Sequence, residues 1–458
     1  MQRLKTIIII MSTYLLLPFI SVMSGFSVEA ASYDNYVKVG LKYGNNSVQS
    51  CTLRSEEGFQ LGTAENRGFE AGMPLPAYEK LIITNERGAI VVQDEDGVLL
   101  SADLGSNGCI MPANYNYGGI LYYENTPYRG GIILLPNSNG TITVINYLMM
   151  EHYLYGVLNS EMGYTNSIEA LKAQAVAARS FAELSLGKHS EAGFDLCPTT
   201  CCQVYRGYSG EYPSILKAVD ETKGKMLYHN GAPISAFYFK NSGGYTQNVE
   251  DVWSFSRSYL RAVEDKYCPI YPWNITLSYD TIQADLEAAG FRSGTIESVV
   301  INERNKTGAV MELKITGSED TVYLKKDRIR STLGPTKIKS LMFELTDNGA
   351  TEAASSWTIS NGSSAIKPDS SIFIISGDGV VKKIENNALH AYNGIETIIL
   401  GKHSSSGITT GKSPTVNFSG YGYGHGVGMA QDSAIEMAKQ GFTYDEILEY
   451  FYTDIEIK

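Results

Sequence analysis

One carboxylate in the sequence has a setting that suits acid–base chemistry. Glu161 closes residues 153–162 (YLYGVLNSEM), follows an apolar run and precedes the start of a helix. Apolar surroundings disfavour the charged form of a carboxyl group, which suits a general acid. A structural alternative is that Glu161 complements the helix dipole or forms an ion pair with Arg179 or Lys172. The residues alone leave both interpretations open.

A second candidate lies near the end of the chain, where residues 420–431 read GYGYGHGVGMAQ. Glycine occupies every second position from Gly420 to Gly428, and His425 stands among these glycines. Alternate glycines usually mark close backbone approach or unusual φ angles, so the run is either a flexible loop or a surface cleared around His425. A capping box at Thr443 and Glu446 follows soon after, which favours a fixed structure.

Ser242 and Gly243 belong to a third segment, residues 239–247 (FKNSGGYTQ), which predicts a strand followed by a Gly-Gly turn. The turn suggests a nucleophilic serine, but no G-x-S-x-G elbow is present and turn serines are common. The sequence also lacks a P-loop, a G-x-G-x-x-G fingerprint and an H-E-x-x-H motif. Nucleotide and zincin chemistry are therefore disfavoured.

Residues 1–30 have the anatomy of a secretory signal: a basic start, a mostly apolar stretch and a small-residue cleavage site. A retained membrane anchor is the alternative. We therefore expect a secreted or extracytoplasmic protein whose only membrane contact is through this segment. The net charge of −12 argues against nucleic acid or an anionic membrane surface as a partner.

Export makes disulfides possible among the six cysteines. Cys51 and Cys109 can pair within the first domain. A separate cluster offers three thiols and one imidazole within fourteen residues, a donor set that can hold tetrahedral zinc. Its members are His189, Cys197, Cys201 and Cys202. A local disulfide, for instance with Cys268, or simple buried thiols are the alternatives.

The elements that must position these residues predict an α+β fold. Short apolar runs separated by Gly and Asn indicate a β-rich N-terminal region at residues 31–130. A core of mixed strands and a few amphipathic helices occupies residues 131–345 and resumes at residues 416–458. Residues 346–415 are rich in Ser, Thr, Gly and Asn and predict a β-rich insertion or linker-rich subdomain.

Within the core, we expect a helix from residue 166 to Gly187, with many alanines on one face. A helix and a turn are expected at residues 212–229, and further helices at residues 281–289, 430–440 and 444–452. Strands are expected at residues 233–239, 296–302 and 310–315.

Several motifs together resemble the stage II sporulation protein D family, which includes the amidase enhancers. The resemblance covers residues 130–345 and 416–458, in the family's order. The motifs are residues 153–162 with 169–180 (EALKAQAVAARS), 193–197 (GFDLC) with 202–205 (CQVY), 242–246 (SGGYT) with 250–253 (EDVW), 259–263 (YLRAV), and 424–431 (GHGVGMAQ) with 450–452 (YFY).

The resemblance implies a lytic transglycosylase that cuts peptidoglycan glycan strands, preferably strands without stem peptides, with Glu161 as the catalytic acid. It also implies a glycan groove lined by Ser242, Gly243, His425, Gln431, Gln174 and Arg179. For Arg179, a structural ion pair is the alternative.

The cysteine cluster corresponds to a family region that binds zinc in some members. Relatives commonly have His-Cys before Gln-Val-Tyr, whereas this chain has Cys201-Cys202. A non-catalytic role is the second hypothesis: a cell-wall module that binds and stimulates an amidase or another wall hydrolase.

Overall fold

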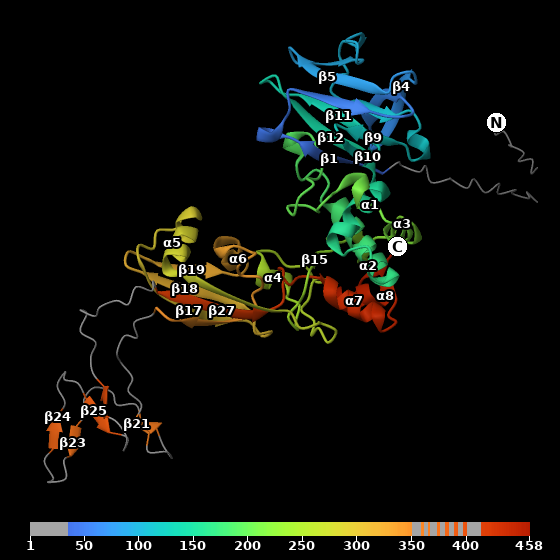
Figure 1. Ribbon diagram of the computed structural model, residues 1–458. Helices are drawn as coiled ribbons and strands as arrows, with labels where there is room; N and C mark the ends of the chain where they lie inside the picture. The colour runs from blue at the N-terminus through green and yellow to red at the C-terminus, as the bar shows by residue number, and fades with distance from the viewer. Residues whose placement is uncertain are drawn as a thin grey trace, which may run out of the picture.

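The computed structural model describes residues 35–349 and 414–458, together with short strands between them (Figure 1). The expected signal or anchor at residues 1–30 lies outside the described residues. Among the residues that were described, no helix is both long enough and apolar enough to cross a membrane. The architecture is α+β, as predicted.

The N-terminal region is a β sandwich of two six-stranded sheets (Figure 1). The strand order is β1-β12-β11-β8-β3-β4 in one sheet and β10-β9-β2-β5-β6-β7 in the other. The strands are β1 (Tyr36–Lys42), β2 (Ser50–Arg54), β3 (Phe59–Glu65), β4 (Gly68–Leu75), β5 (Lys80–Glu86), β6 (Ala89–Gln93), β7 (Leu99–Ser101), β8 (Gly108–Pro112), β9 (Ile120–Tyr123), β10 (Thr126–Arg129), β11 (Gly131–Pro136) and β12 (Ile142–Met149). Short 3-10 turns occupy Gly44–Asn46 and Tyr115–Tyr117.

The domain boundary expected at residue 131 falls inside this sandwich. Strands β11 and β12 pair with each other, and β12 also pairs with β1. The sandwich therefore ends at Met149, where helix α1 begins.

The possible disulfide between Cys51 and Cys109 is not formed: both are free, buried thiols. Cys51 packs in the core between the two sheets. Neighbouring residues of β8 point to opposite faces of its sheet: Ile110 enters that same core, whereas Cys109 packs against the helices below. The two thiols therefore face different cores.

The helical core lies below the sandwich in Figure 1, and its central helix, α2, packs against α1, α3, α7 and α8. The helices are α1 (Met150–Glu161), α2 (Ile168–Leu184), α3 (Pro213–Glu221), α4 (Val249–Val252), α7 (Gln431–Lys439) and α8 (Tyr444–Phe451). Short strands and 3-10 turns complete this part: β13 (Leu227–His229), β14 (Ala232–Pro233), β15 (Tyr238–Phe239), β28 (Met429–Ala430), β29 (Glu456–Ile457), Ser190–Ala192 and Gly207–Gly210.

The sequence predicted the alanine-rich helix and the capping box correctly. Leu171, Ala175, Ala178 and Ala182 are fully buried on α2, where small side chains let neighbouring helices approach closely. Thr443 and Glu446 form both hydrogen bonds of the capping box at the start of α8.

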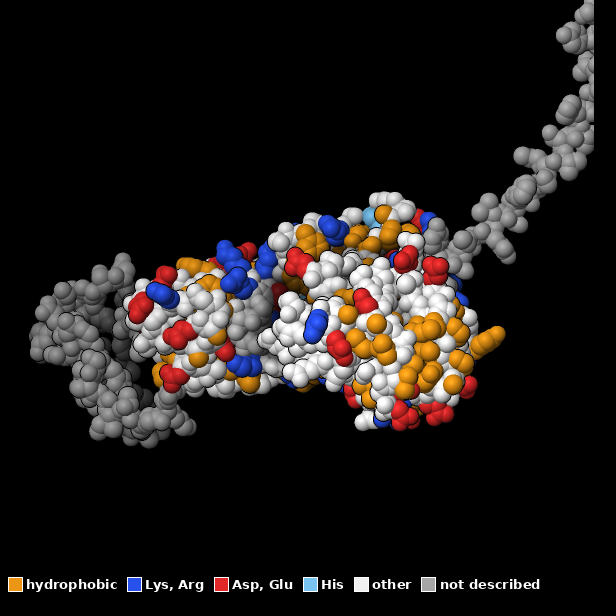
Figure 2. All heavy atoms as spheres, turned by 90° about the horizontal axis from the view of Figure 1, so that it is seen from above, with side chains coloured by type: hydrophobic (Ala, Val, Ile, Leu, Met, Phe, Trp, Pro, Cys, Tyr) orange, Lys and Arg blue, Asp and Glu red, His pale blue; other side chains and the backbone are white. Residues whose placement is uncertain are grey.

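Residues 272–347 and 415–421 form a unit with its own hydrophobic core. The region that the sequence predicted as one domain therefore has two separate hydrophobic cores. Its elements are β16 (Pro272–Ser278), α5 (Tyr279–Ala288), β17 (Ile296–Arg304), β18 (Val310–Gly317), β19 (Thr321–Lys325), α6 (Arg328–Leu333), β20 (Phe343–Asp347) and β27 (Thr415–Tyr421). Figure 2 shows this unit beside the rest of the molecule from above, with acidic and basic side chains mixed over the visible face.

The insertion at residues 346–415 leaves and re-enters this unit at one place, because β20 and β27 pair directly in antiparallel register. Its described strands form three separate hairpins, in agreement with the β-rich prediction. They are β21 (Ile359–Ser360) with β22 (Ala365–Ile366), β23 (Phe373–Ile375) with β24 (Val381–Lys383), and β25 (Leu389–Tyr392) with β26 (Thr397–Leu400).

Candidate functional site

Glu161 is the last residue of α1 and is partly exposed to solvent. The backbone N–H of Val204 donates to its Oε1 across a long 3.4 Å, and the side-chain amide of Gln431 also bonds the carboxylate. Burial raises the pKa of Glu161, and these two hydrogen bonds offset part of that rise by favouring the charged form. The negative end of the α1 dipole also disfavours a carboxylate at this position.

The structural alternatives for Glu161 do not hold. Lys172 pairs with Glu169 and Glu221, and Arg179 pairs with Glu151. Glu161 also lies at the C-terminal end of α1 rather than at the start of α2, so it does not complement a helix dipole. Glu161 is therefore a partly buried carboxyl group that is held by neutral hydrogen-bond donors. Such a group is suited to acid–base chemistry.

Neutral hydroxyl and amide groups surround this carboxyl group. Tyr153 donates to Oε1 of Gln203 at 3.0 Å, and Nε2 of Gln203 donates to the hydroxyl of Tyr238 at 2.9 Å. Burial raises the pKa of both tyrosines far above its usual value, and the charge of Glu161 raises each further. Both phenols therefore stay protonated beside Glu161.

Sequence reasoning did not select Tyr153, Gln203 or Tyr238 as site residues. Tyr153 and Gln203 lie within motifs that resemble the family, and Gln203 directly follows the cysteine pair. Their position in these motifs was the only sequence feature that could have marked them as site residues. Tyr238 had no such feature, since it is placed here by the pairing of β15 with β28, two strands that lie far apart in the sequence.

Gln174 and Gln431 form the support for Glu161 rather than an exposed groove. Nε2 of Gln431 lies 3.3 Å from Oε1 of Gln174. Gln174 is fully buried and Gln431 is 5% exposed, so their amides face other side chains. Within the described residues, Nε2 of Gln174 has no hydrogen-bond partner. The expectation that Gln174 contacts a glycan is wrong, because the residue has no exposed surface.

The expectation that Arg179 lines the groove is also wrong. Its side chain is 2% exposed and forms a forked ion pair with Glu151, with N–O distances of 3.0 and 2.6 Å. It also donates to the carbonyl of Lys225 at 2.9 Å. Arg179 therefore joins α1, α2 and the chain before β13, as the structural alternative proposed.

Ser242 lies in a buried turn that is linked to α7 through Asp265. It is 3% exposed, donates to Oδ2 of Asp265 at 2.6 Å, and accepts the N–H of Gly244 at 3.1 Å. Ser433 of α7 donates to the same Asp265 oxygen. The expectation that Ser242 contacts a glycan is therefore wrong, because its side chain is buried and its hydroxyl proton is donated to Asp265. Gly243 is partly exposed and has φ of 68°.

His425 is held by backbone groups at both ring nitrogens. Nε2 donates to the carbonyl of Tyr238 at 3.1 Å, and Nδ1 accepts the N–H of Val427 at 3.1 Å. Burial, with the charge of Arg330 as the second cause, lowers the pKa of His425 to about 3. The ring is therefore neutral and carries no free nitrogen, so it positions Tyr238 instead of reacting.

The glycines around His425 are required by the chain itself. Gly422, Gly424, Gly426 and Gly428 all have positive φ, which side chains with a Cβ rarely adopt. A Cβ on Gly428 would stand 2.0 Å from the carbonyl oxygen of Phe237. The run is fixed, as expected, but the cleared space holds the 237–247 segment rather than an open groove.

The four predicted metal ligands converge. One ligand atom from each of His189, Cys197, Cys201 and Cys202 lies within 4.8 Å of all the others. Nε2 of His189 is 3.4 Å from Sγ of Cys202 and 3.9 Å from Sγ of Cys201. Tetrahedral zinc with bonds of about 2.1 Å to nitrogen and 2.3 Å to sulfur requires similar separations, so the donors fit zinc.

Cys268 takes no part in this cluster. Its thiol lies 3.2 Å from Oδ1 of Asn241, and all six cysteines are free. The suggested disulfide with Cys268 is therefore wrong.

Comparison with known proteins gives two family matches. Residues 138–229, which include Glu161 and the cysteine cluster, match the stage II sporulation protein (SpoIID) family. Residues 246–363 match a domain of unknown function.

Three relatives are similar over most of this chain. An uncharacterised protein of Brachyspira hyodysenteriae is 30% identical over 83% of this chain and 85% of its own length. The amidase enhancer of Bacillus subtilis is 30% identical over 75% of this chain, but the match spans only 46% of that protein. Stage II sporulation protein D of Bacillus subtilis is 28% identical over 68% of this chain and 75% of its own length.

Proposed function

The chain belongs to the stage II sporulation protein D family, and we propose that it is a lytic transglycosylase of the bacterial cell wall. Its substrate would be peptidoglycan glycan strands, preferably without stem peptides, and its product would carry 1,6-anhydromuramic acid ends. Sporulation or general wall remodelling would be its setting, and residues 1–30 would direct it out of the cytoplasm.

The observation that supports this proposal is the solitary Glu161. Within the described residues, the groups that hydrogen-bond Glu161 are the N–H of Val204 and the amide of Gln431, and no carboxylate is among the causes of its raised pKa. Ordinary glycoside hydrolysis needs two carboxyl groups, separated by about 5 to 10 Å. A single carboxyl group suffices when the substrate supplies its own nucleophile.

The proposed reaction uses Glu161 twice. Its proton moves to the glycosidic oxygen while the bond from that oxygen to C1 of muramic acid breaks. The carboxylate then takes the proton of the 6-hydroxyl of the same sugar while O6 bonds to C1. The anhydro ring forms, and Glu161 is protonated again. Acid–base catalysis of this kind contributes roughly a hundredfold to ten-thousandfold in rate.

The raised pKa of Glu161 suits the first step, because it keeps the acid protonated at higher pH than an exposed glutamate. Val204 and Gln431 stabilise the carboxylate that the first step leaves. Gln174 holds Gln431 in place.

We further propose that His189, Cys197, Cys201 and Cys202 hold a zinc ion. Zinc would supply structure here, because four protein ligands leave no open position for a substrate. The ligand Cys202 directly precedes Gln203 and Val204, so fixing it would also fix the Val204 N–H on Glu161. Mass spectrometry of the native protein tests this, and about one zinc per chain is expected. The Cys201→Ser variant, which lacks one ligand, is the control and is expected to contain no zinc.

Product analysis tests the reaction. Purified protein is incubated with peptidoglycan before and after amidase treatment, and anhydro ends are counted by mass spectrometry. We expect release from the treated material and a loss of a hundredfold or more in Glu161→Gln. Glu57→Gln, an exposed glutamate on the sandwich, is the matched control. Equal release by Glu161→Gln would refute the assignment.

A non-catalytic role is the second candidate, and the similarity to an amidase enhancer favours it. In that case the protein would bind the wall or an amidase and stimulate the amidase. Neither substrate would then yield anhydro ends, while amidase turnover would rise on adding either the parent protein or Glu161→Gln.

A further inference from the structure

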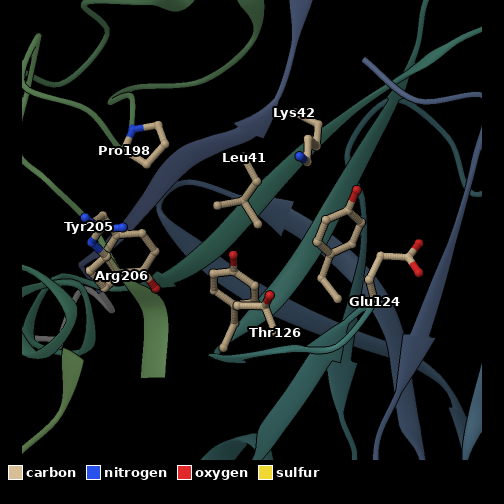
Figure 3. A pocket seen from close by; sticks show the side chains of 9 residues that line it. Leu41, Lys42, Glu124, Thr126, Pro198, Tyr205 and Arg206 are labelled. Carbon is tan, nitrogen blue, oxygen red and sulfur yellow. The ribbon is translucent and has the colours of Figure 1, made fainter. Parts of the chain in front are cut away.

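A cavity of about 410 Å³ lies where the β sandwich meets the helical core (Figure 3). This volume falls in the range of small-molecule sites. The sandwich contributes Leu41, Lys42, Tyr123, Glu124, Thr126 and Tyr128, and the core contributes Pro198, Tyr205 and Arg206. Nothing in the proposed reaction uses this cavity.

Its walls are held firmly on both sides. Arg129 of β10 forms a forked ion pair with Glu211, with N–O distances of 2.7 and 2.8 Å. The hydroxyl of Tyr205 donates to Oδ1 of Asn146 at 2.7 Å. A Cβ on Gly207 would meet the Tyr128 ring at 2.7 Å, so the core loop and the sandwich are in close contact. The cavity is therefore preformed.

The lining carries two cations without partners. Lys42 and Arg206 are exposed, and within the described residues neither forms an ion pair or a side-chain hydrogen bond. Glu124 accepts the N–H of Thr52 instead. The lining thus carries two cations against one carboxylate, and in a chain of net charge −12 this local excess of positive charge favours an anionic ligand.

The remaining lining suits a sugar. Burial is the main cause that raises the pKa of Tyr123 and of Tyr128, so both phenols stay protonated and can donate to hydroxyl or acetamido oxygens. Thr126 adds an exposed hydroxyl, and the tyrosine rings offer flat apolar faces. Figure 3 shows Thr126 and Glu124 on the sandwich side, opposite Tyr205 and Arg206.

We propose that this cavity binds a carboxylate-bearing amino sugar, the muramic acid unit of a glycan strand without its stem peptide. Removal of the peptide frees the lactyl carboxylate, which Lys42 and Arg206 would bind. The identity of the sugar rests on the proposed function.

The cavity is connected to Glu161 by a short stretch of chain. Val204 bonds Glu161, and Arg206 lies two residues further, no more than about 7 Å along the chain. The same loop would thus hold one sugar of a strand and position the acid that cuts it.

Binding to Glu161→Gln protein tests the inference separately from catalysis. The probes are the peptide-free disaccharide N-acetylglucosaminyl-N-acetylmuramic acid, the same disaccharide with its stem peptide, and N,N′-diacetylchitobiose, a neutral disaccharide that lacks a carboxylate. Calorimetry is expected to give about tenfold tighter binding of the peptide-free disaccharide than of N,N′-diacetylchitobiose. Lys42→Gln/Arg206→Gln should abolish that difference, because both cations are lost.

Arg292→Gln/Lys306→Gln is the matched control: it removes the same charge from exposed positions of another unit and should bind as the parent does. The inference is overturned if the Lys42→Gln/Arg206→Gln variant keeps the parent's preference for the peptide-free disaccharide. It is also overturned if the disaccharide with its stem peptide binds more tightly than the peptide-free one. If anhydro ends never form but the preference depends on Lys42 and Arg206, only the proposed reaction fails. If anhydro ends form without this dependence, only the inference fails.

Discussion

Gln431, the first residue of α7, places its Nε2 3.3 Å from Oε1 of Gln174 in the middle of α2, across 257 positions of the chain. Because the Gln431 amide also bonds Glu161, the residue that ends the C-terminal glycine-rich segment contacts the carboxyl group directly. The glycine run therefore acts on the site by positioning α7.

Gln431→Leu should raise the pKa of Glu161 further, because it removes a hydrogen bond that favours the charged form. The alkaline limb of the pH–rate profile should move to higher pH, and NMR titration of the Glu161 carboxyl carbon should show the same direction. Gln440→Leu, at the exposed end of α7, is the control and should leave both unchanged. A carboxyl titration that stays in place would argue against the Gln431 contact.

Glu161→Gln should stabilise the protein at neutral pH. The folded-state pKa of Glu161 is raised above its ordinary 4.5, so its contribution to stability is complete below that pH and is lost as the pH rises through the folded-state value. Glutamine mimics the protonated acid and avoids the loss. Thermal melting should give a higher Tm than the parent at pH 7 and equal values near pH 4. A lower Tm at pH 7 would contradict this.

His425 should make the fold sensitive to acid. Its pKa is about 3 in the folded protein against an ordinary 6.5, so its stabilisation is present above pH 6.5 and is lost as the pH falls from 6.5 towards 3. His425→Gln should flatten this part of the stability curve measured by urea unfolding. Some sensitivity will remain, since burial also lowers the pKa of His152, to about 4. An unchanged slope would show that His425 already binds a proton when folded.

The sequence predicted the elements that depend on local chemistry. The capping box at Thr443 and the alanine face of α2 need only neighbouring residues to be recognised. The convergence of the four candidate metal ligands was predicted for the same reason, because they lie within fourteen residues of one another in the sequence.

The residues that the sequence assigned wrongly depend on distant partners. Arg179 could face a groove or a carboxylate, and only the position of Glu151 on α1 decides between them. Cys109 could meet Cys51, but the alternation of β8 sends it to the opposite face of its sheet. The role of Ser242 depends on its hydrogen bond to Asp265, and no local sequence pattern identifies that partner.

Arg179→Met should destabilise the protein by about 3–5 kcal/mol, because it leaves the Glu151 carboxylate without its partner. Adding Glu151→Leu should recover much of that loss, since two apolar side chains leave no unpaired charge. Urea unfolding measures both. Lys439→Met, which breaks the exposed pair with Glu436, should cost no more than about 1 kcal/mol. A similarly small effect of Arg179→Met would mean that the buried pair contributes little.

Substitution of two glycines that have positive φ distinguishes the cost of backbone strain from the cost of close packing. Gly441, which follows α7, has φ of 94° and open space around a Cβ, so Gly441→Ala should cost only the strain, about 1 kcal/mol. Gly428 has φ of 78°, but its Cβ would stand 2.0 Å from the carbonyl oxygen of Phe237, next to Tyr238. Gly428→Ala should therefore cost at least about 1 kcal/mol more in urea unfolding, because the backbone of residues 237–239 must move.

That movement displaces Tyr238, which lies beside Glu161, so Gly428→Ala should also change the carboxyl titration of Glu161, whereas Gly441→Ala should not. Equal effects of the two substitutions on unfolding and titration would mean that the glycine run only relieves strain and does not position the site.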